Sequence, residues 1–126
     1  MPAPKLSKLE YQIMEVLWEK GEPSLREIQD AFPKDQRPAY TTIQTMVYRM
    51  EAKGIVRRVK KVGNFHLFAA TITPDAAQRR LIEDLLAVFG GRSQLLMAHL
   101  IQGGKLSLAD VKEAEKMLRQ LSQKEK

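Results

Sequence analysis

The chain has 126 residues, a length that allows one compact domain or two very small ones. It carries 21 Lys and Arg against 15 Asp and Glu, and the net charge of +6 favours an acidic partner such as nucleic acid. The absence of cysteine excludes disulfides and thiolate metal sites. No apolar run approaches the roughly 20 residues needed to span a bilayer, and the first residues lack the apolar core of a secretory signal. We therefore expect a cytoplasmic protein without membrane insertion.

Two capping boxes predict the first two helices. Ser7 is followed three residues later by Glu10, and Ser24 is followed by Glu27. In this arrangement each side chain accepts a hydrogen bond from the backbone N–H of the other residue. Apolar residues then recur at helical spacing, and Pro33 ends the second helix.

A third helix is predicted over residues 40–53, with two contrasting faces. Its apolar stripe consists of Ile43, Met46, Val47 and Met50. Its other face carries hydroxyl, amide and guanidinium groups, on Thr41, Thr42, Gln44, Thr45, Tyr48 and Arg49. Threonine is a poor helix former, so helix propensity does not explain this face. Capping and a solvated surface are one explanation. We favour the other, in which these groups bond DNA phosphates and base edges.

Two strands are predicted next, over residues 55–62 and 65–70, around Gly63-Asn64, a two-residue hairpin signal. Three helices followed by a hairpin have the order of a winged helix-turn-helix. The window 49–61 holds six basic residues and one acid, and so carries most of the net charge. A tight hairpin projects its tip beyond the helices. We therefore expect Lys60, Lys61 and Asn64 to contact the DNA backbone.

The second half changes character, and we place a winged-helix DNA-binding domain over residues 1–71 and a helical dimerisation domain over 72–126. Three further helices are predicted, beginning at Pro74, Ser93 and after Ser107. Some fifty residues in three helices supply little core. We expect a second copy of the chain to cover their apolar surface, with the contact at or near Leu96, Leu100, Val111, Leu118 and Leu121. The alternative is that these helices fold back on the winged helix.

The predicted fold is thus mainly α with a small β-hairpin. Two stretches, KLSKLEYQIMEVLWEKGEPSLREI (5–28) and AYTTIQTMVYRMEAKGIVRR (39–58), resemble the first helices and the recognition helix of the BlaI/MecI penicillinase repressor family. The similarity covers nearly the whole chain and is strongest through about residue 70.

The resemblance implies a homodimeric transcriptional repressor bound to a palindromic operator in double-stranded DNA. It also implies release by proteolysis in the dimerisation domain, after a membrane-bound sensor metalloprotease signals. The matching bond here is His99–Leu100, where known members have Asn before an aromatic residue. Copper-responsive relatives carry a cysteine cluster that this chain lacks, which excludes copper sensing through thiols.

We expect no enzyme and no cofactor. Neither His66 nor His99 has a local partner at metal-ligand spacing, and the chain has no nucleophile elbow, P-loop or dinucleotide-binding turn. Two other functions stay open. A winged helix that binds proteins would expose apolar residues on its third helix. A regulator gated by a small molecule would need a pocket, which a sequence does not reveal.

Overall fold

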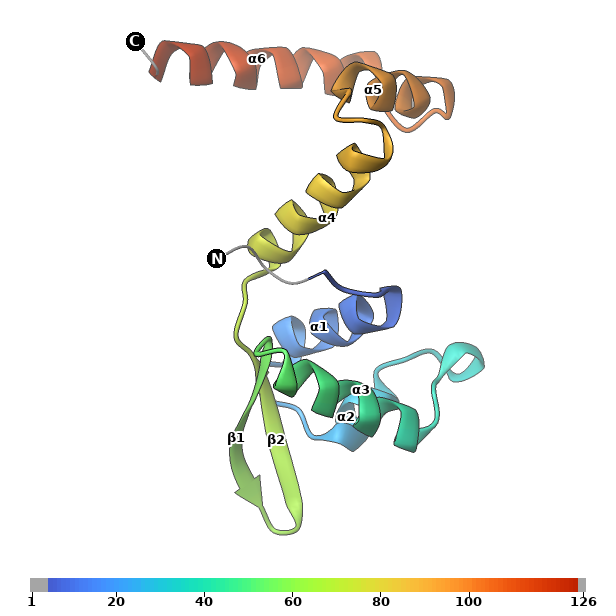
Figure 1. The fold of residues 1–126 in the computed structure, drawn as a ribbon, viewed down its shortest axis with the longest axis vertical. Coiled ribbons are helices and arrows are strands. Elements are labelled where there is room, and N and C mark those ends of the chain that lie inside the picture. The colour runs from blue at the N-terminus through green and yellow to red at the C-terminus, as the bar shows by residue number, and fades with distance from the viewer. Residues whose placement is uncertain (1–4, 125–126) are drawn as a thin grey trace. The chain divides into compact units, whose positions relative to one another are not determined.

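The computed structural model describes residues 5–124, which form helices and a two-stranded antiparallel sheet (Figure 1). A mainly α fold that carries a hairpin confirms the predicted fold class. The predicted 40–53 helix and 55–62 strand each differ by one residue at one end from the observed element. In chain order the elements are α1 (Lys8–Lys20), α2 (Leu25–Asp30), the 3-10 helix η1 (Lys34–Gln36), α3 (Tyr40–Ala52), β1 (Val56–Val62), β2 (Phe65–Ala70), α4 (Pro74–Val88), α5 (Ser93–Gln102) and α6 (Leu108–Lys124).

Reciprocal hydrogen bonds confirm the predicted capping boxes. At the start of α1, Ser7 N donates to Glu10 Oε1 at 2.9 Å, and Glu10 N donates to Ser7 Oγ at 3.2 Å. The same pair of bonds begins α2 and α6, formed by Ser24 with Glu27 and by Ser107 with Asp110. Because these bonds satisfy N–H groups that a helix leaves without partners, short-range sequence chemistry fixes where these three helices begin.

One apolar core joins α1, α2, α3 and the hairpin. It is made of buried side chains from these elements, from residues just outside their ends and from the first turn of α4, namely Leu6, Ile13, Met14, Leu17, Leu25, Ile28, Phe32, Ile43, Val47, Met50, Ile55, Val56, Phe68 and Ala77. Trp18 adds a polar tie, since its Nε1 donates to the carbonyl oxygen of Ile72 at 2.9 Å, just before α4 begins.

An ion pair between a buried carboxylate and a partly exposed lysine connects α1 to the end of α3. Lys53 Nζ lies 2.6 Å from Glu10 Oε2, and Glu10 is only 5% exposed. Burial raises the pKa of Glu10, but the hydrogen bonds from Lys53 and Ser7 outweigh it and hold the pKa below its ordinary value. Glu10 therefore both begins α1 and anchors the end of α3.

The hairpin contains an irregularity that the sequence does not reveal. Arg58 pairs with Phe68, but Lys61 pairs with His66, so β1 has one residue more than β2 between these pairs. This is a β-bulge. Because side chains alternate along a strand, the bulge places Lys61 on the same face as Arg58. At the turn, Gly63 has a φ of +59°, a conformation that glycine adopts without strain.

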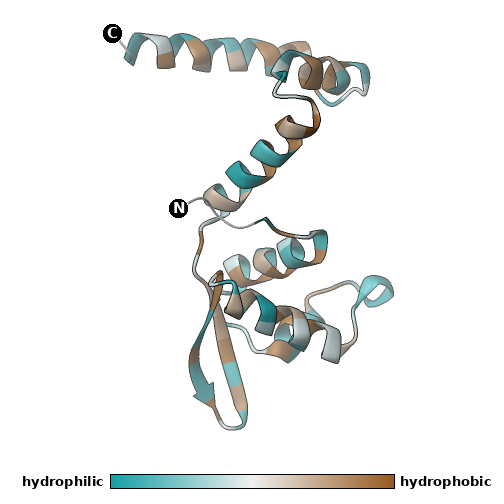
Figure 2. Ribbon diagram, in the orientation of Figure 1, coloured by the Kyte–Doolittle hydropathy of each residue, from teal (hydrophilic) through white to brown (hydrophobic). Residues whose placement is uncertain are grey.

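The chain divides into two compact units between Glu83 and Asp84, inside α4. The first unit contains the core described above. In the second unit no described residue is buried, and hydrophobic colour recurs along α5 and α6 (Figure 2). The domain boundary that we place between residues 71 and 72 stays a prediction.

The Glu10–Lys53 pair predicts a pH-dependent stability. A carboxylate whose pKa is lowered in the folded state stabilises the fold above its ordinary pKa of 4.5 and loses that contribution as pH falls through the lowered value. Glu10→Gln should therefore reduce the free energy of unfolding by about 1–2 kcal/mol at neutral pH, a figure discounted because Lys53 is partly exposed. The difference should shrink in acid, as measured by urea unfolding.

Glu15→Gln is the matched control for this variant. Glu15 is an exposed residue of the same helix, so its substitution should change stability little at either pH. A Glu10→Gln protein as stable as the parent at neutral pH would show that the pair contributes nothing.

Candidate nucleic-acid interface

The outer face of α3 carries the polar residues that the sequence predicts. Thr41, Thr42, Thr45 and Arg49 are exposed and line an open hollow of about 270 Å³ together with Met46. Within residues 5–124, no hydrogen bond or ion pair engages the side chains of these threonines or of Arg49. Their donors and acceptors are free to bind a ligand.

Capping does not explain the threonines of α3. Ala39 occupies the N-cap position of α3, and its side chain cannot accept a hydrogen bond from the backbone N–H groups of the first turn. Thr41 and Thr42 lie inside the helix, where threonine is unfavourable. The first turn of α3 thus presents hydroxyl groups without a structural role in this part of the chain.

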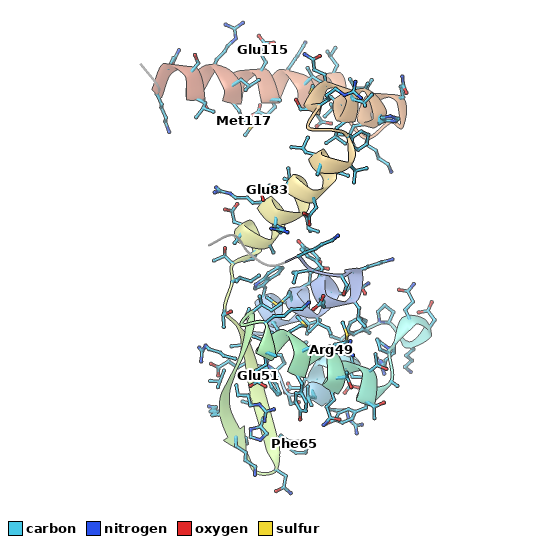
Figure 3. The ribbon with its side chains drawn as sticks, viewed as in Figure 1. Arg49, Glu51, Phe65, Glu83, Glu115 and Met117 are labelled. Atoms are coloured by element: carbon cyan, nitrogen blue, oxygen red, sulfur yellow. The ribbon has the colours of Figure 1, made fainter. Side chains whose placement is uncertain are left out.

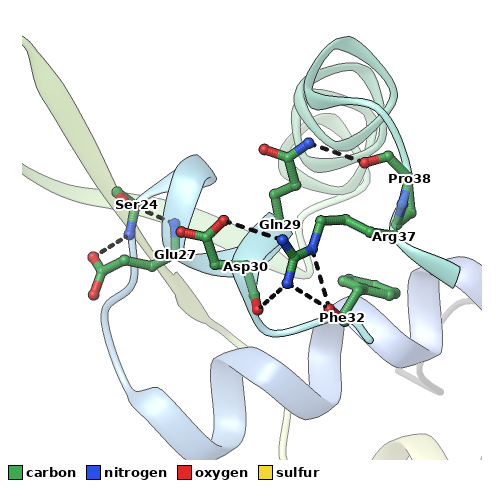
Figure 4. A network of polar contacts seen from close by, with 7 residues as sticks. All are labelled: Ser24, Glu27, Gln29, Asp30, Phe32, Arg37 and Pro38. Atoms are coloured by element: carbon green, nitrogen blue, oxygen red, sulfur yellow. Dashed lines mark hydrogen bonds and ion pairs between the residues drawn. The ribbon is translucent and has the colours of Figure 1, made fainter. Parts of the chain in front are cut away.

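The loop between α2 and α3 is held by one arginine (Figure 4). The Arg37 guanidinium donates to the carbonyl oxygen of Phe32 at 2.9 and 3.1 Å and to that of Asp30 at 3.0 Å. Gln29 Nε2 donates to the carbonyl oxygen of Pro38 at 3.0 Å, next to the start of α3. These bonds fix the point at which α3 begins. No local motif in the sequence gives a signal for this role of Arg37.

A second cluster joins α3 to the hairpin. Gln44 Nε2 donates to Tyr48 Oη at 3.2 Å. The ring of Tyr48 lies 6.5 Å from that of Phe68 in a tilted arrangement, and the Arg58 guanidinium lies 4.8 Å from the centre of the Tyr48 ring. Glu51 holds Arg58 in turn, since Arg58 Nε donates to its carboxylate at 2.9 and 3.2 Å. We call Glu51, Arg58, Tyr48 and Phe68 the Arg58 stack.

The wing brings the remaining predicted contact residues to one end of the hairpin. Lys60, Lys61 and Asn64 are all exposed. The bulge lies between Arg58 and Lys61, so the regular alternation of side chains between the two faces of the strand is interrupted at the two lysines. Phe65, labelled at the turn end of the hairpin in Figure 3, is 61% exposed. Phe65 is not among the residues that the sequence predicts to contact DNA, although its place beside the Gly63-Asn64 turn is a signal.

Ion pairing alters the charge count of the basic window. Lys53 is paired with Glu10, and Arg58 with Glu51, so neither charge is available to a ligand at full strength. The acid counted in this window is Glu51, seven positions before Arg58, but the partner of Lys53 lies 43 positions away and is not visible in a local pattern. In the described part of the chain, four basic residues of the window have no ion pair: Arg49, Arg57, Lys60 and Lys61.

The predicted dimer-contact residues lie in the second unit, on α5 and α6. Leu96, Leu100 and Val111 are half-buried, whereas Leu118 and Leu121 are 66% and 55% exposed. Leu118 and Leu121 line an open hollow of about 570 Å³ along α6, together with Ala114 and Met117. Met117 is labelled on this helix in Figure 3. The helix thus presents a continuous apolar stripe to its surroundings.

The predicted cleavage bond lies inside a helix. His99 is exposed and Leu100 half-buried on α5, and the His99 ring lies 5.5 Å from that of Phe89. Helical backbone does not have the extended form in which proteases bind peptides, so cleavage would require α5 to open locally. Across residues 5–124, no helix is both long and apolar enough to cross a membrane.

Comparisons with known proteins agree with this arrangement. The family model described as penicillinase repressor matches residues 6–120. The chain is 24% identical to a penicillinase repressor of Staphylococcus aureus over 95% of both chains, and 28% identical to the transcriptional regulator BlaI of Mycobacterium tuberculosis over 78% of this chain and 72% of that one. The fold is similar to the solution structure of monomeric Bacillus licheniformis BlaI in complex with the blaP half-operator, with a TM-score of 0.50, 26% identity, and coverage of 59% of this chain and 89% of that chain.

Proposed function

Because this chain belongs to the penicillinase repressor family, we propose that it is a transcriptional repressor that binds a palindromic DNA operator as a homodimer. The half-operator complex of the B. licheniformis relative supports a DNA-binding role for the first unit. The single observation that carries the proposal is the exposed polar face of α3, where the hydroxyl groups of its three threonines and the Arg49 guanidinium have no partner within the described chain.

In this proposal α3 is the helix that enters the major groove. Residues of its first turns, Thr41, Thr42, Gln44 and Thr45, lie nearest the bases, and Arg49, two turns further along, reaches phosphate. Lys60, Lys61 and Asn64 contact the backbone beside the half-site. Tyr48, whose hydroxyl accepts a hydrogen bond from Gln44, belongs to the same DNA-binding face.

The exposed residues of α3 favour this function over protein binding. A protein-interaction module would present apolar side chains there, but the large apolar residues exposed on α3 in the described structure are Tyr40 and Tyr48, each with a hydroxyl group. A gate by a small molecule finds less support. In the first unit, the hollow between α3 and the hairpin is about 150 Å³ and the one on the outer face of α3 about 270 Å³, both below the range of typical ligand pockets. The larger hollow along α6 is lined by side chains of that one helix, whereas ligand pockets are concave sites that enclose most of the ligand.

The second unit supports the homodimer. With no buried residue in its described part, it lacks a core of its own. The α6 stripe, spaced at Val111, Ala114, Leu118 and Leu121, has the pattern of a two-helix seam. A second copy would cover the stripe through a two-fold axis.

We also propose that repression is relieved by proteolysis of the chain at the His99–Leu100 bond, after a membrane-bound sensor metalloprotease signals. Cutting α5 would separate α6 from the DNA-binding unit and so dissociate the dimer. Intact-mass analysis of the repressor recovered from its own cells under derepressing conditions should then give two fragments that meet at this bond. A chain that stays whole while transcription resumes would contradict the proteolytic step.

Leu118→Asp should weaken the dimer, because each copy of the chain then places an unpaired carboxylate in the apolar contact. We expect the dissociation constant measured by sedimentation to rise at least about tenfold. Gln123→Asp adds the same charge to an exposed position of α6 outside the stripe and should change it little. A parent protein that sediments as a monomer at micromolar concentration would contradict the dimer itself.

The wing lysines give the test of DNA binding. Each phosphate contact contributes about 0.9 to the slope of log affinity against log salt. Lys60→Ala/Lys61→Ala should therefore flatten the slope by roughly 3–4 for a dimer with two wings, on operator and random duplex alike, because backbone contacts position without specifying sequence.

The matched control for the wing is Lys105→Ala/Lys112→Ala, which removes two exposed lysines from the second unit. This control should leave the slope almost unchanged. An unchanged slope in the wing variant would mean that its lysines only keep the hairpin soluble. A lost operator preference would mean that the wing reads bases.

A further inference from the structure

We propose that Gln44 reads an adenine in each half of the operator, and that the Arg58 stack holds its amide in the reading position. This inference rests on the proposed function, since it names the base that the α3 face selects. It assigns one residue to base recognition and gives Tyr48, Arg58 and Glu51 a positioning role.

The hydrogen bond of Gln44 carries the argument. Its Nε2 donates to Tyr48 Oη at 3.2 Å, and an amide nitrogen has two hydrogens. One N–H and the carbonyl Oε1 therefore remain, and within residues 5–124 neither has a partner. Gln44 is half-buried and lines the hollow between α3 and the hairpin, so it presents one donor and one acceptor side by side at the edge of the α3 face.

This pair of groups matches one base edge in the major groove. Adenine offers the N7 acceptor beside the N6 amino donor, which a glutamine amide binds through two hydrogen bonds. Guanine offers two acceptors, and cytosine offers a donor alone. The donor and acceptor left on Gln44 therefore favour adenine.

The stack explains why the amide is already oriented. A free glutamine loses rotamer entropy when it is fixed on a base, and a side chain ordered in advance loses less. Tyr48 is ordered by contact with Phe68 on the core side and by the Arg58 guanidinium, 4.8 Å from its ring centre. Arg58 is ordered by the two hydrogen bonds to Glu51. The wing strand thus fixes a side chain of the helix.

Selection from a pool of DNA duplexes with a random central segment tests the inference. The full chain should enrich a palindromic motif with an adenine whose preference falls roughly 5- to 150-fold in Gln44→Ala, with other positions unaffected. Gln44→Glu should shift the same position toward cytosine, because a carboxylate accepts from the cytosine amino group. Gln78→Ala, at an exposed glutamine of α4, is the matched control and should select the parent motif.

Tyr48→Phe tests the positioning role, because it keeps the ring in the stack and removes only the hydroxyl that holds Gln44. It should weaken the adenine preference at the same position while the salt slope stays unchanged. An equal adenine preference in Tyr48→Phe would overturn the positioning role. A motif unchanged by Gln44→Ala and Gln44→Glu, or a Gln44-sensitive position that selects another base, would overturn the reading role. A parent chain that enriches no motif would instead contradict the proposed function.

Discussion

The polar face of α3 is held in place by three side chains on the opposite side of the helix, Ile43, Val47 and Met50, all fully buried. Everything proposed for the first unit depends on this burial, since a helix of thirteen residues has little stability of its own. With one side fixed in the core, the other side must face outward. The loop hydrogen bonds of Arg37 at its start and the Lys53–Glu10 pair at its end then set its position along its axis.

Much of the fold could be predicted because the relevant chemistry is local. Ser7 with Glu10, and Ser24 with Glu27, lie three residues apart, so their reciprocal hydrogen bonds are visible in sequence. The Gly63-Asn64 turn likewise predicted the hairpin. Helix periodicity predicted which side of α3 is buried. The residues on its other side are the polar ones that form the candidate site. Each of these signals is carried by residues within one or two turns of one another.

The rest could not be predicted because it depends on contacts between distant segments. Lys53 finds Glu10 across 43 positions, and the stacking of Arg58 on Tyr48 requires the register of β1 against α3. The β-bulge between Arg58 and Lys61 likewise has no signal in the residues of the hairpin itself. As a result, a count of basic residues overstated the charge open to DNA, and the link from Arg58 through Tyr48 to Gln44 stayed hidden.

The hairpin has a further consequence for how these molecules behave when crowded. A two-stranded sheet has two edges, and an exposed edge invites strand addition from another copy and hence aggregation. Here the β2 edge is covered near its middle, where Phe68 N donates to Pro23 O and Ser24 bridges Leu67. The β1 edge carries Arg57, Lys60 and Lys61 and is interrupted by the bulge, features that oppose edge-to-edge pairing. The wing can therefore project into solvent without drawing copies together through their sheets, so that it does not compete with the association proposed for the helices of the second unit.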